Sequence, residues 1–132
     1  MGAEPWDYFV TYEPNIQTAL DKLRQREFAA GRFRGSELNP TSIREAFENM
    51  DADGTASILD IERVSDEADY GAVCPLSSSE LTRYFGTDKP TRDQITTNMD
   101  YYEDIERGQG IYIIVYKDDK PSEIFFAGYS FD

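Results

Sequence analysis

Apolar residues that alternate with other residues mark strands at both ends of the chain. Near the N-terminus, Trp6, Tyr8, Val10 and Tyr12 recur with period two until Pro14 ends the segment. Near the C-terminus, the runs IYIIVY and PSEIFFAGY flank the polar break KDDK, which predicts a β-hairpin within residues 110–129. Both faces of this hairpin carry apolar residues, so we expect it at the centre of a sheet that is covered on two sides.

The hairpin loop determines which residues of the two strands face each other. With Asp118 and Asp119 as a two-residue loop, the predicted pairs are Val115 with Ser122, Ile113 with Ile124, Ile111 with Phe126 and Tyr112 with Phe125. The first three pairs then share one face of the hairpin, and the fourth pair lies on the other face.

Helical periodicity appears first after Asn15, which is suited to cap a helix. The apolar stripe of this helix is Ile16, Leu20, Leu23 and Ala30, with Ala19 beside it and Gly31 at its end. A second helix is predicted over residues 41–50. Its apolar face consists of Ile43, Phe47 and Met50, and its cap is open among Asn39, Thr41 and Ser42.

Two capping boxes predict two further helices. Ser77 with Glu80 opens one helix, which ends at Gly86. Thr91 with Gln94 opens the other, which we expect to continue through Arg107, before Gly108. The buried face predicted for this last helix consists of Ile95, Met99, Tyr102 and Ile105.

Between the helix pairs, β-branched residues predict a strand over residues 57–64 and a short return strand over residues 70–74, joined by an acidic turn. The predicted order is β-α-α-β-β-α-α-β-β. Because strands and helices occur in adjacent pairs, we expect one compact α+β domain over residues 1–132. Its sheet should be mainly antiparallel, with about five strands, four helices and the C-terminal hairpin in the middle.

The charge of the chain bears on its partners. The chain carries 26 acidic and 13 basic residues, a formal net charge of −13. Acids and bases balance in residues 1–34, so the whole excess lies in residues 35–132. Such a field repels nucleic acid and anionic membranes and accelerates encounters with basic partners. Apolar runs are too short for a membrane span, and the N-terminus lacks the pattern of a signal peptide, so we expect a cytoplasmic protein.

The sequence also excludes several kinds of chemistry. It contains no histidine, which removes catalytic triads and metal sites that depend on histidine within one chain. Its one cysteine, Cys74, lies between apolar neighbours and is predicted to pack in the interior. No phosphate-binding glycine motif is present. We therefore predict no cofactor.

One segment, IREAFENMDADGTASILDIE, resembles a calcium-binding EF-hand in its entering helix and part of its loop. Position 6 of the loop, which needs glycine, is occupied by Ala56, and the glycine comes two places early at Gly54. The alternative interpretation is a helix end, an Asp-Gly turn and the start of a strand. The calcium ligands that the resemblance implies are Asp51, Asp53, Thr55, Ser57 and Glu62.

Three other groups of residues are candidates for chemistry. Asp60 and Glu123 have apolar neighbours and are the carboxylates expected to be partly buried, either at an edge or paired with an arginine such as Arg63 or Arg44. Tyr112, Tyr116 and Tyr129 are candidate pocket residues, although aromatic residues in strands are usually core. A small anion-binding patch is the alternative to solvated side chains for Arg24, Arg26, Arg32 and Arg34.

The favoured hypothesis is a non-enzymatic module that binds and masks a basic protein surface, as an inhibitor or an immunity protein does. An alternative is a small enzyme or ligand-binding domain that uses carboxylates, tyrosines and the arginine cluster; another is the calcium binder. The partner-binding residues predicted for the favoured hypothesis are Asp66, Glu67 and Asp69 in the acidic turn, and Asp100, Glu103, Asp104 and Glu106 on the last helix.

Overall fold

The computed structural model describes residues 3–132, and this part of the chain forms one compact α+β domain. The strands are β1 (Pro5–Thr11), β2 (Arg63–Val64), β3 (Ala72–Pro75), β4 (Gly110–Lys117) and β5 (Lys120–Tyr129). The α-helices are α1 (Ile16–Ala30), α2 (Ile43–Asn49), α3 (Ser78–Phe85) and α4 (Arg92–Thr97). Short 3₁₀ helices are η1 (Ser36–Leu38), η2 (Ile58–Asp60) and η3 (Asp100–Asp104). The predicted fold class is confirmed.

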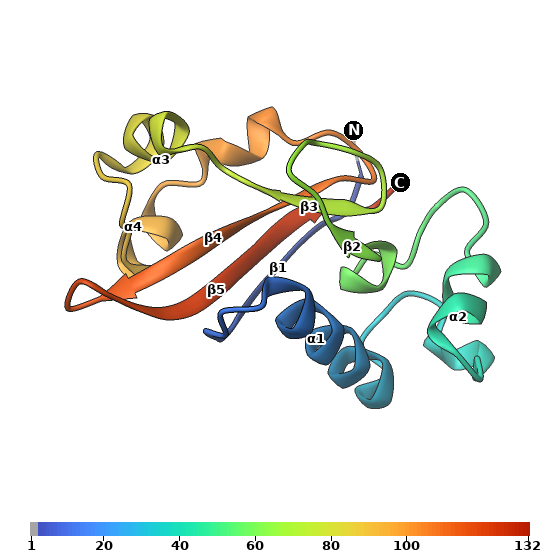
Figure 1. The fold of residues 1–132 in the computed structure, drawn as a ribbon. Helices are drawn as coiled ribbons and strands as arrows, with labels where there is room; N and C mark the ends of the chain where they lie inside the picture. Colours follow the sequence, from blue (N-terminus) through green and yellow to red (C-terminus); the bar gives the residue numbers. More distant parts are fainter. Residues whose placement is uncertain (1–2) are drawn as a thin grey trace.

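The five strands form one mixed sheet in the order β1-β5-β4-β3-β2 (Figure 1). The long hairpin of β4 and β5 occupies the middle, as predicted, and β1 pairs antiparallel with β5. The pairs of β3 with β4 and of β2 with β3 are parallel. The segment with α3, α4 and η3 connects β3 to β4, so it provides the crossover that a parallel pair requires.

Helices cover both faces of the sheet, which explains why both faces of the hairpin are apolar. On one face, Leu20 and Leu23 of α1 pack with Ile124 and Phe126 of β5, together with η2. On the other face, α3, α4 and η3 enclose a second cluster (Figure 1). Its fully buried members include Ile95, Tyr101 and Phe125. Within residues 3–132, no helix is long and apolar enough to cross a membrane.

The predicted pairing within the hairpin is wrong by one residue. The loop is Asp118 with Asp119, as expected, and Tyr116 pairs with Pro121, but Val115 then pairs with Glu123. This bulge inserts one extra residue into β5, and a shift of one residue moves every later side chain to the opposite face. The corrected pairs are Ile114 with Ile124, Ile113 with Phe125, Tyr112 with Phe126 and Ile111 with Ala127.

The last predicted helix is also wrong, because α4 ends at Thr97. Asn98 has an extended backbone, and its side chain donates to the carbonyl of Tyr84 at 2.7 Å and accepts from the amide of Asp100 at 3.0 Å. These bonds compete with continuation of the helix. The chain resumes as η3, which buries Tyr101 instead of Tyr102 and leaves Met99 49% exposed.

Two smaller expectations need correction. The strand predicted over residues 57–64 is interrupted by η2, because the hydroxyl of Ser57 caps this turn through the amide of Leu59, and only β2 pairs in the sheet. On α1, the cap Asn15 and the end at Gly31 are confirmed. However, Ala30 is exposed, and Glu27 is the buried residue of the last turns.

Candidate functional site

The two acidic segments predicted to bind a partner lie next to each other at one end of the molecule. The amide of Gly71, after the acidic turn, donates to the carbonyl of Gly108 at 2.9 Å, after η3. Tyr70 from the first segment and Glu103 and Glu106 from the second line one open cavity of about 720 Å³, which we call the acidic groove. Its lining is completed by Ala3, Tyr102, Ile105, Arg107, Tyr129 and Phe131.

Aromatic rings in fixed positions form the walls of the acidic groove. Tyr70 stacks on Phe131 with ring centroids 6.3 Å apart, and Tyr102 meets Tyr129 edge to face at 5.4 Å. The hydroxyl of Tyr102 donates to the carbonyl of Trp6 at 3.0 Å, and burial raises the pKa of this phenol. Tyr70 is 61% exposed, so its ring offers a face to a ligand. The groove therefore combines ring faces with carboxylates.

All seven acids predicted to bind a partner are exposed. Asp69 forms an ion pair with Arg63, and Asp104 forms one with Arg83 at 3.1 Å. Within residues 3–132, no ion pair involves the other five, which are Asp66, Glu67, Asp100, Glu103 and Glu106. This end of the molecule therefore keeps an excess of negative charge around the acidic groove. The charged residues that line the groove itself are Glu103, Glu106 and Arg107.

The arginines predicted as an anion-binding patch do not face one site. Glu27, only 3% exposed, accepts from Arg26 at 2.9 Å and from Arg32 at 2.8 Å. The bond to Arg32 is the main cause of the lowered pKa of Glu27. Arg34 instead donates to the backbone carbonyls of residues 53 and 54 at 3.1 and 3.2 Å. Arg26, Arg32 and Arg34 therefore make structural contacts within the protein, whereas Arg24 lines a cavity.

The residues that resemble calcium ligands are not gathered either. Asp51, Asp53 and Glu62 are exposed, whereas Thr55 and Ser57 are buried and their hydroxyls bond to each other at 2.8 Å. After the entering helix α2, the chain forms η2 where an EF-hand needs an exit helix. Across the described residues 3–132, no group of three or more acidic or cysteine side chains is placed to hold a metal ion.

The carboxylates expected to be partly buried are confirmed as such, but with other partners. Asp60 is 2% exposed and accepts from the amide and hydroxyl of Thr55 at 2.7 and 2.8 Å and from the hydroxyl of Ser130 at 2.5 Å. Burial raises the pKa of Asp60. Glu123 is half-buried and pairs with Arg92 at 2.8 Å. The sequence suggested pairing with Arg63 or Arg44, but neither carboxylate pairs with either of them.

The aromatic residues of the acidic groove were only partly predicted. Tyr129 was a candidate and lies in the groove, whereas Tyr112 and Tyr116 line a smaller cavity elsewhere. Tyr70 and Phe131 were missed. The signal available in the sequence was the aromatic character of the last residues, GYSFD, and of the residue that follows the acidic turn.

Comparison of the chain with protein-family models, with curated proteins and with solved structures found no match in any of the three searches.

Proposed function

We propose that this protein is a non-enzymatic module that binds a basic protein surface and masks it, in the way that an inhibitor or an immunity protein does. The observation that carries this proposal is the acidic groove, in which Glu103 and Glu106 share a cavity with the exposed ring of Tyr70. Carboxylates beside aromatic faces form a site that is complementary to a cationic side chain.

An arginine side chain of the partner is the cation that fits this groove best. Its planar guanidinium can stack on a tyrosine ring while its N–H groups donate to carboxylates, which an ammonium group does less well. A cation over an exposed ring contributes about 0.5–1 kcal/mol, and about 2 kcal/mol once water is excluded. Stacking on Tyr70 and pairing with Glu103 or Glu106 would act together on one side chain.

The acids around the groove contribute mainly to the rate of association. Asp66, Glu67 and Asp100 are exposed and outside the groove lining, so they attract a basic partner over a distance without being desolvated. Such steering weakens as salt concentration rises, because mobile ions screen exposed charges. Binding should therefore depend strongly on ionic strength.

Carboxylate catalysis is less well supported by the same geometry. Glu103 and Glu106 are both exposed, whereas carboxylates that act as general acids are usually tuned by burial in apolar surroundings. Asp60 is buried, but its oxygens already accept bonds from Thr55 and Ser130. We therefore place binding ahead of turnover.

The direct test is a fluorescence-anisotropy titration with a labelled arginine-rich peptide, an otherwise identical glutamine-rich peptide, and low and high salt. We expect only the arginine-rich peptide to bind, and more weakly at high salt. The variant E103Q/E106Q should bind about tenfold more weakly, equivalent to roughly 1.4 kcal/mol. Y70A should also weaken binding.

The matched control is D118N/D119N, which removes the same charge at the tip of the β4–β5 hairpin, at the other end of the molecule (Figure 1). We expect this control to bind like the wild type. If both double variants weakened peptide binding equally, the weakening would be due to the change in net charge. That result would contradict a specific role for the groove. Binding that is indifferent to salt would contradict the proposal as a whole.

A further inference from the structure

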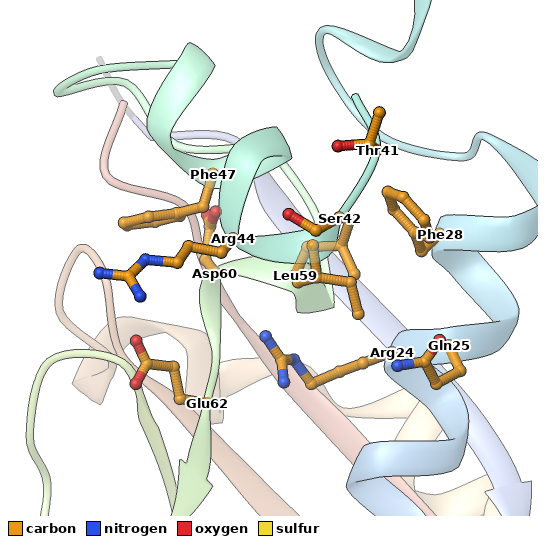
Figure 2. Close-up of a pocket in the computed structure, with 11 residues that line it drawn as sticks. Arg24, Gln25, Phe28, Thr41, Ser42, Arg44, Phe47, Leu59, Asp60 and Glu62 are labelled. Carbon is orange, nitrogen blue, oxygen red and sulfur yellow. The ribbon is translucent and has the colours of Figure 1, made fainter. Parts of the chain in front are cut away.

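A second cavity lies between α1 and α2, separate from the acidic groove. Its volume is about 890 Å³. Figure 2 shows Arg24, Gln25 and Phe28 from α1 on one side and Arg44 and Phe47 from α2 on the other. Leu59 and Glu62, from η2 and the segment after it, close the remaining side. We call this space the α1–α2 cavity.

Arg24 enters this cavity with an unsatisfied hydrogen-bond donor. Its Nε atom is buried and has no partner within the described residues, unlike Nε of Arg26 and Arg32, which donate to Glu27. A buried donor without an acceptor is unfavourable, because it has given up its hydrogen bond to water. Burial also lowers the pKa of Arg24, although the charges of Asp21 and Glu62 act in the opposite direction. An acidic oxygen on a ligand would supply the missing acceptor.

Two acidic residues line the α1–α2 cavity. Asp60 already accepts bonds from Thr55 and Ser130, which leaves Glu62. Its exposed carboxylate attracts Arg24, but no ion pair joins the two side chains, and Arg44 pairs instead with Glu48 at 3.3 Å. In Figure 2 the carboxylate of Glu62 and the guanidinium of Arg24 lie across open space within the same cavity. Arg44 and Asp60 also line the cavity, but both already have partners within the protein. Arg24 and Glu62 are therefore the charged groups left for a ligand to lie between.

Part of the remaining wall is apolar. Phe28 and Phe47 are half-buried, and the side chain of Leu59 is buried beneath them. A simple anion would gain nothing from this wall and would approach a chain with a net charge of −13. A zwitterion with an apolar body avoids that repulsion and can use all three features.

We infer that the α1–α2 cavity binds a free α-amino acid with an aromatic or large aliphatic side chain. Its carboxylate accepts from Arg24, its ammonium group donates to Glu62, and its side chain packs against Phe28 and Phe47. This binding would be independent of the acidic groove and of any basic protein partner. Pockets that combine an apolar lining with a few converging polar groups are typical of small-molecule sites.

The test is a titration followed by two-dimensional ¹H–¹⁵N NMR with L-phenylalanine and two analogues that each lack one charged group. These are 3-phenylpropionate, without the ammonium group, and 2-phenylethylamine, without the carboxylate. We expect L-phenylalanine to shift amide signals of α1 and α2, and each analogue to bind at least about tenfold more weakly, the effect of roughly 1.4 kcal/mol.

The variants separate the two charged contacts. R24Q should lose both L-phenylalanine and 3-phenylpropionate. E62Q should weaken L-phenylalanine but strengthen 3-phenylpropionate, because it removes repulsion of a lone carboxylate. K22Q, which changes an exposed residue on the same helix that pairs with Glu13, should behave like the wild type. Thermal melts of each variant establish that it is folded.

Two outcomes would overturn the inference: an absence of shifts with L-phenylalanine, or shifts that R24Q and E62Q leave unchanged. The variant E103Q/E106Q keeps this test distinct from the proposed function. It should bind L-phenylalanine normally even though it binds the arginine-rich peptide weakly. Failure of one proposal therefore leaves the other standing.

Discussion

At the residue scale, the buried hydroxyl of Ser130 lies near two hydrogen-bond acceptors but has only one hydrogen to donate. It accepts from the amide of Ala56 at 3.1 Å and lies 3.1 Å from the carbonyl of Asp53 and 2.5 Å from Oδ2 of Asp60. A hydroxyl has one hydrogen, so it can donate to only one of those two acceptors. If Asp60 is protonated, both contacts can be hydrogen bonds: the carboxylic acid of Asp60 donates to the hydroxyl of Ser130, and this hydroxyl donates to the carbonyl of Asp53. Burial raises the pKa of Asp60, which also favours its protonated form.

This geometry predicts different effects for two substitutions of Asp60. Asp60→Asn keeps a donor toward Ser130 and an acceptor for Thr55. It should therefore change the free energy of unfolding little below the unfolded pKa of Asp60, and it should be more stable than the wild type at higher pH. Asp60→Ala leaves buried partners unpaired and should cost about 2–4 kcal/mol. Urea unfolding of the two variants checks both expectations, and equal destabilisation would contradict this account of the network.

The same residue sets a pH dependence whose sign follows from its raised pKa. The folded state binds the proton more tightly than the unfolded state, so the contribution of Asp60 is complete below the unfolded pKa and is lost as pH rises through the folded pKa. Relative to Asp60→Asn, the wild type should therefore lose stability as pH rises above about 4, the ordinary pKa of an aspartate, and up to the raised pKa of the folded state. Parallel stability curves for the two proteins would show that Asp60 stays ionised.

At the scale of single elements, the β4–β5 hairpin combines a strained loop with a crowded crossing. Asp118 and Asp119 both have positive φ, 53° and 63°, as a type I′ turn requires. Gly110 and Gly128 pair with each other beneath Trp6. A Cβ at Gly128 would lie 2.5 Å from Cζ2 of Trp6, so only glycine allows the indole to cross the strands there.

Replacement of the loop by Asn-Gly, as D118N/D119G, should stabilise the protein by about 0.5–1 kcal/mol, because both positions then tolerate left-handed backbone. The measurement is the midpoint of urea unfolding. G128A, which places a methyl group against Trp6 and the carbonyl of Gln109, should lower the same midpoint. A lower midpoint for D118N/D119G would contradict the turn type.

At the scale of the whole molecule, the fold brings acidic residues from separate segments together at one end. The acidic turn and η3 come from different parts of the sequence, yet they meet at the end of the sheet where Glu4 bonds to Asp132. Four of their acids, and Glu106 just after η3, have no ion pair within residues 3–132. Mutual repulsion between these carboxylates opposes compaction of the chain.

Moderate salt should therefore stabilise the free protein. Between low ionic strength and about 0.2 M NaCl, we expect the melting temperature to rise by about 2–5 °C, because screening weakens the repulsion. Circular dichroism melts in NaCl and in KCl check the effect and separate screening from binding of one particular ion. A fall in melting temperature over this range would show that attractive ion pairs dominate.

The sequence alone determined the features that depend on a few neighbouring residues. The caps Asn15, Ser77 and Thr91 and the helix ends at Gly31 and Gly86 all occur where expected. Each depends on hydrogen bonds between residues three or four positions apart, or on a backbone angle that glycine favours. The α+β class followed from the order of these local elements.

Only the tertiary structure decided the pairing and the sites. The bulge in β5 and the break at Asn98 arise from contacts with other strands and helices, and local periodicity does not encode such contacts. The meeting of Tyr70 with Phe131, and the placement of Arg24 opposite Glu62, join residues far apart in the chain. Composition showed that the chain is acidic, but long-range packing selected which carboxylates border a groove and which arginine has a buried Nε without an acceptor among residues 3–132.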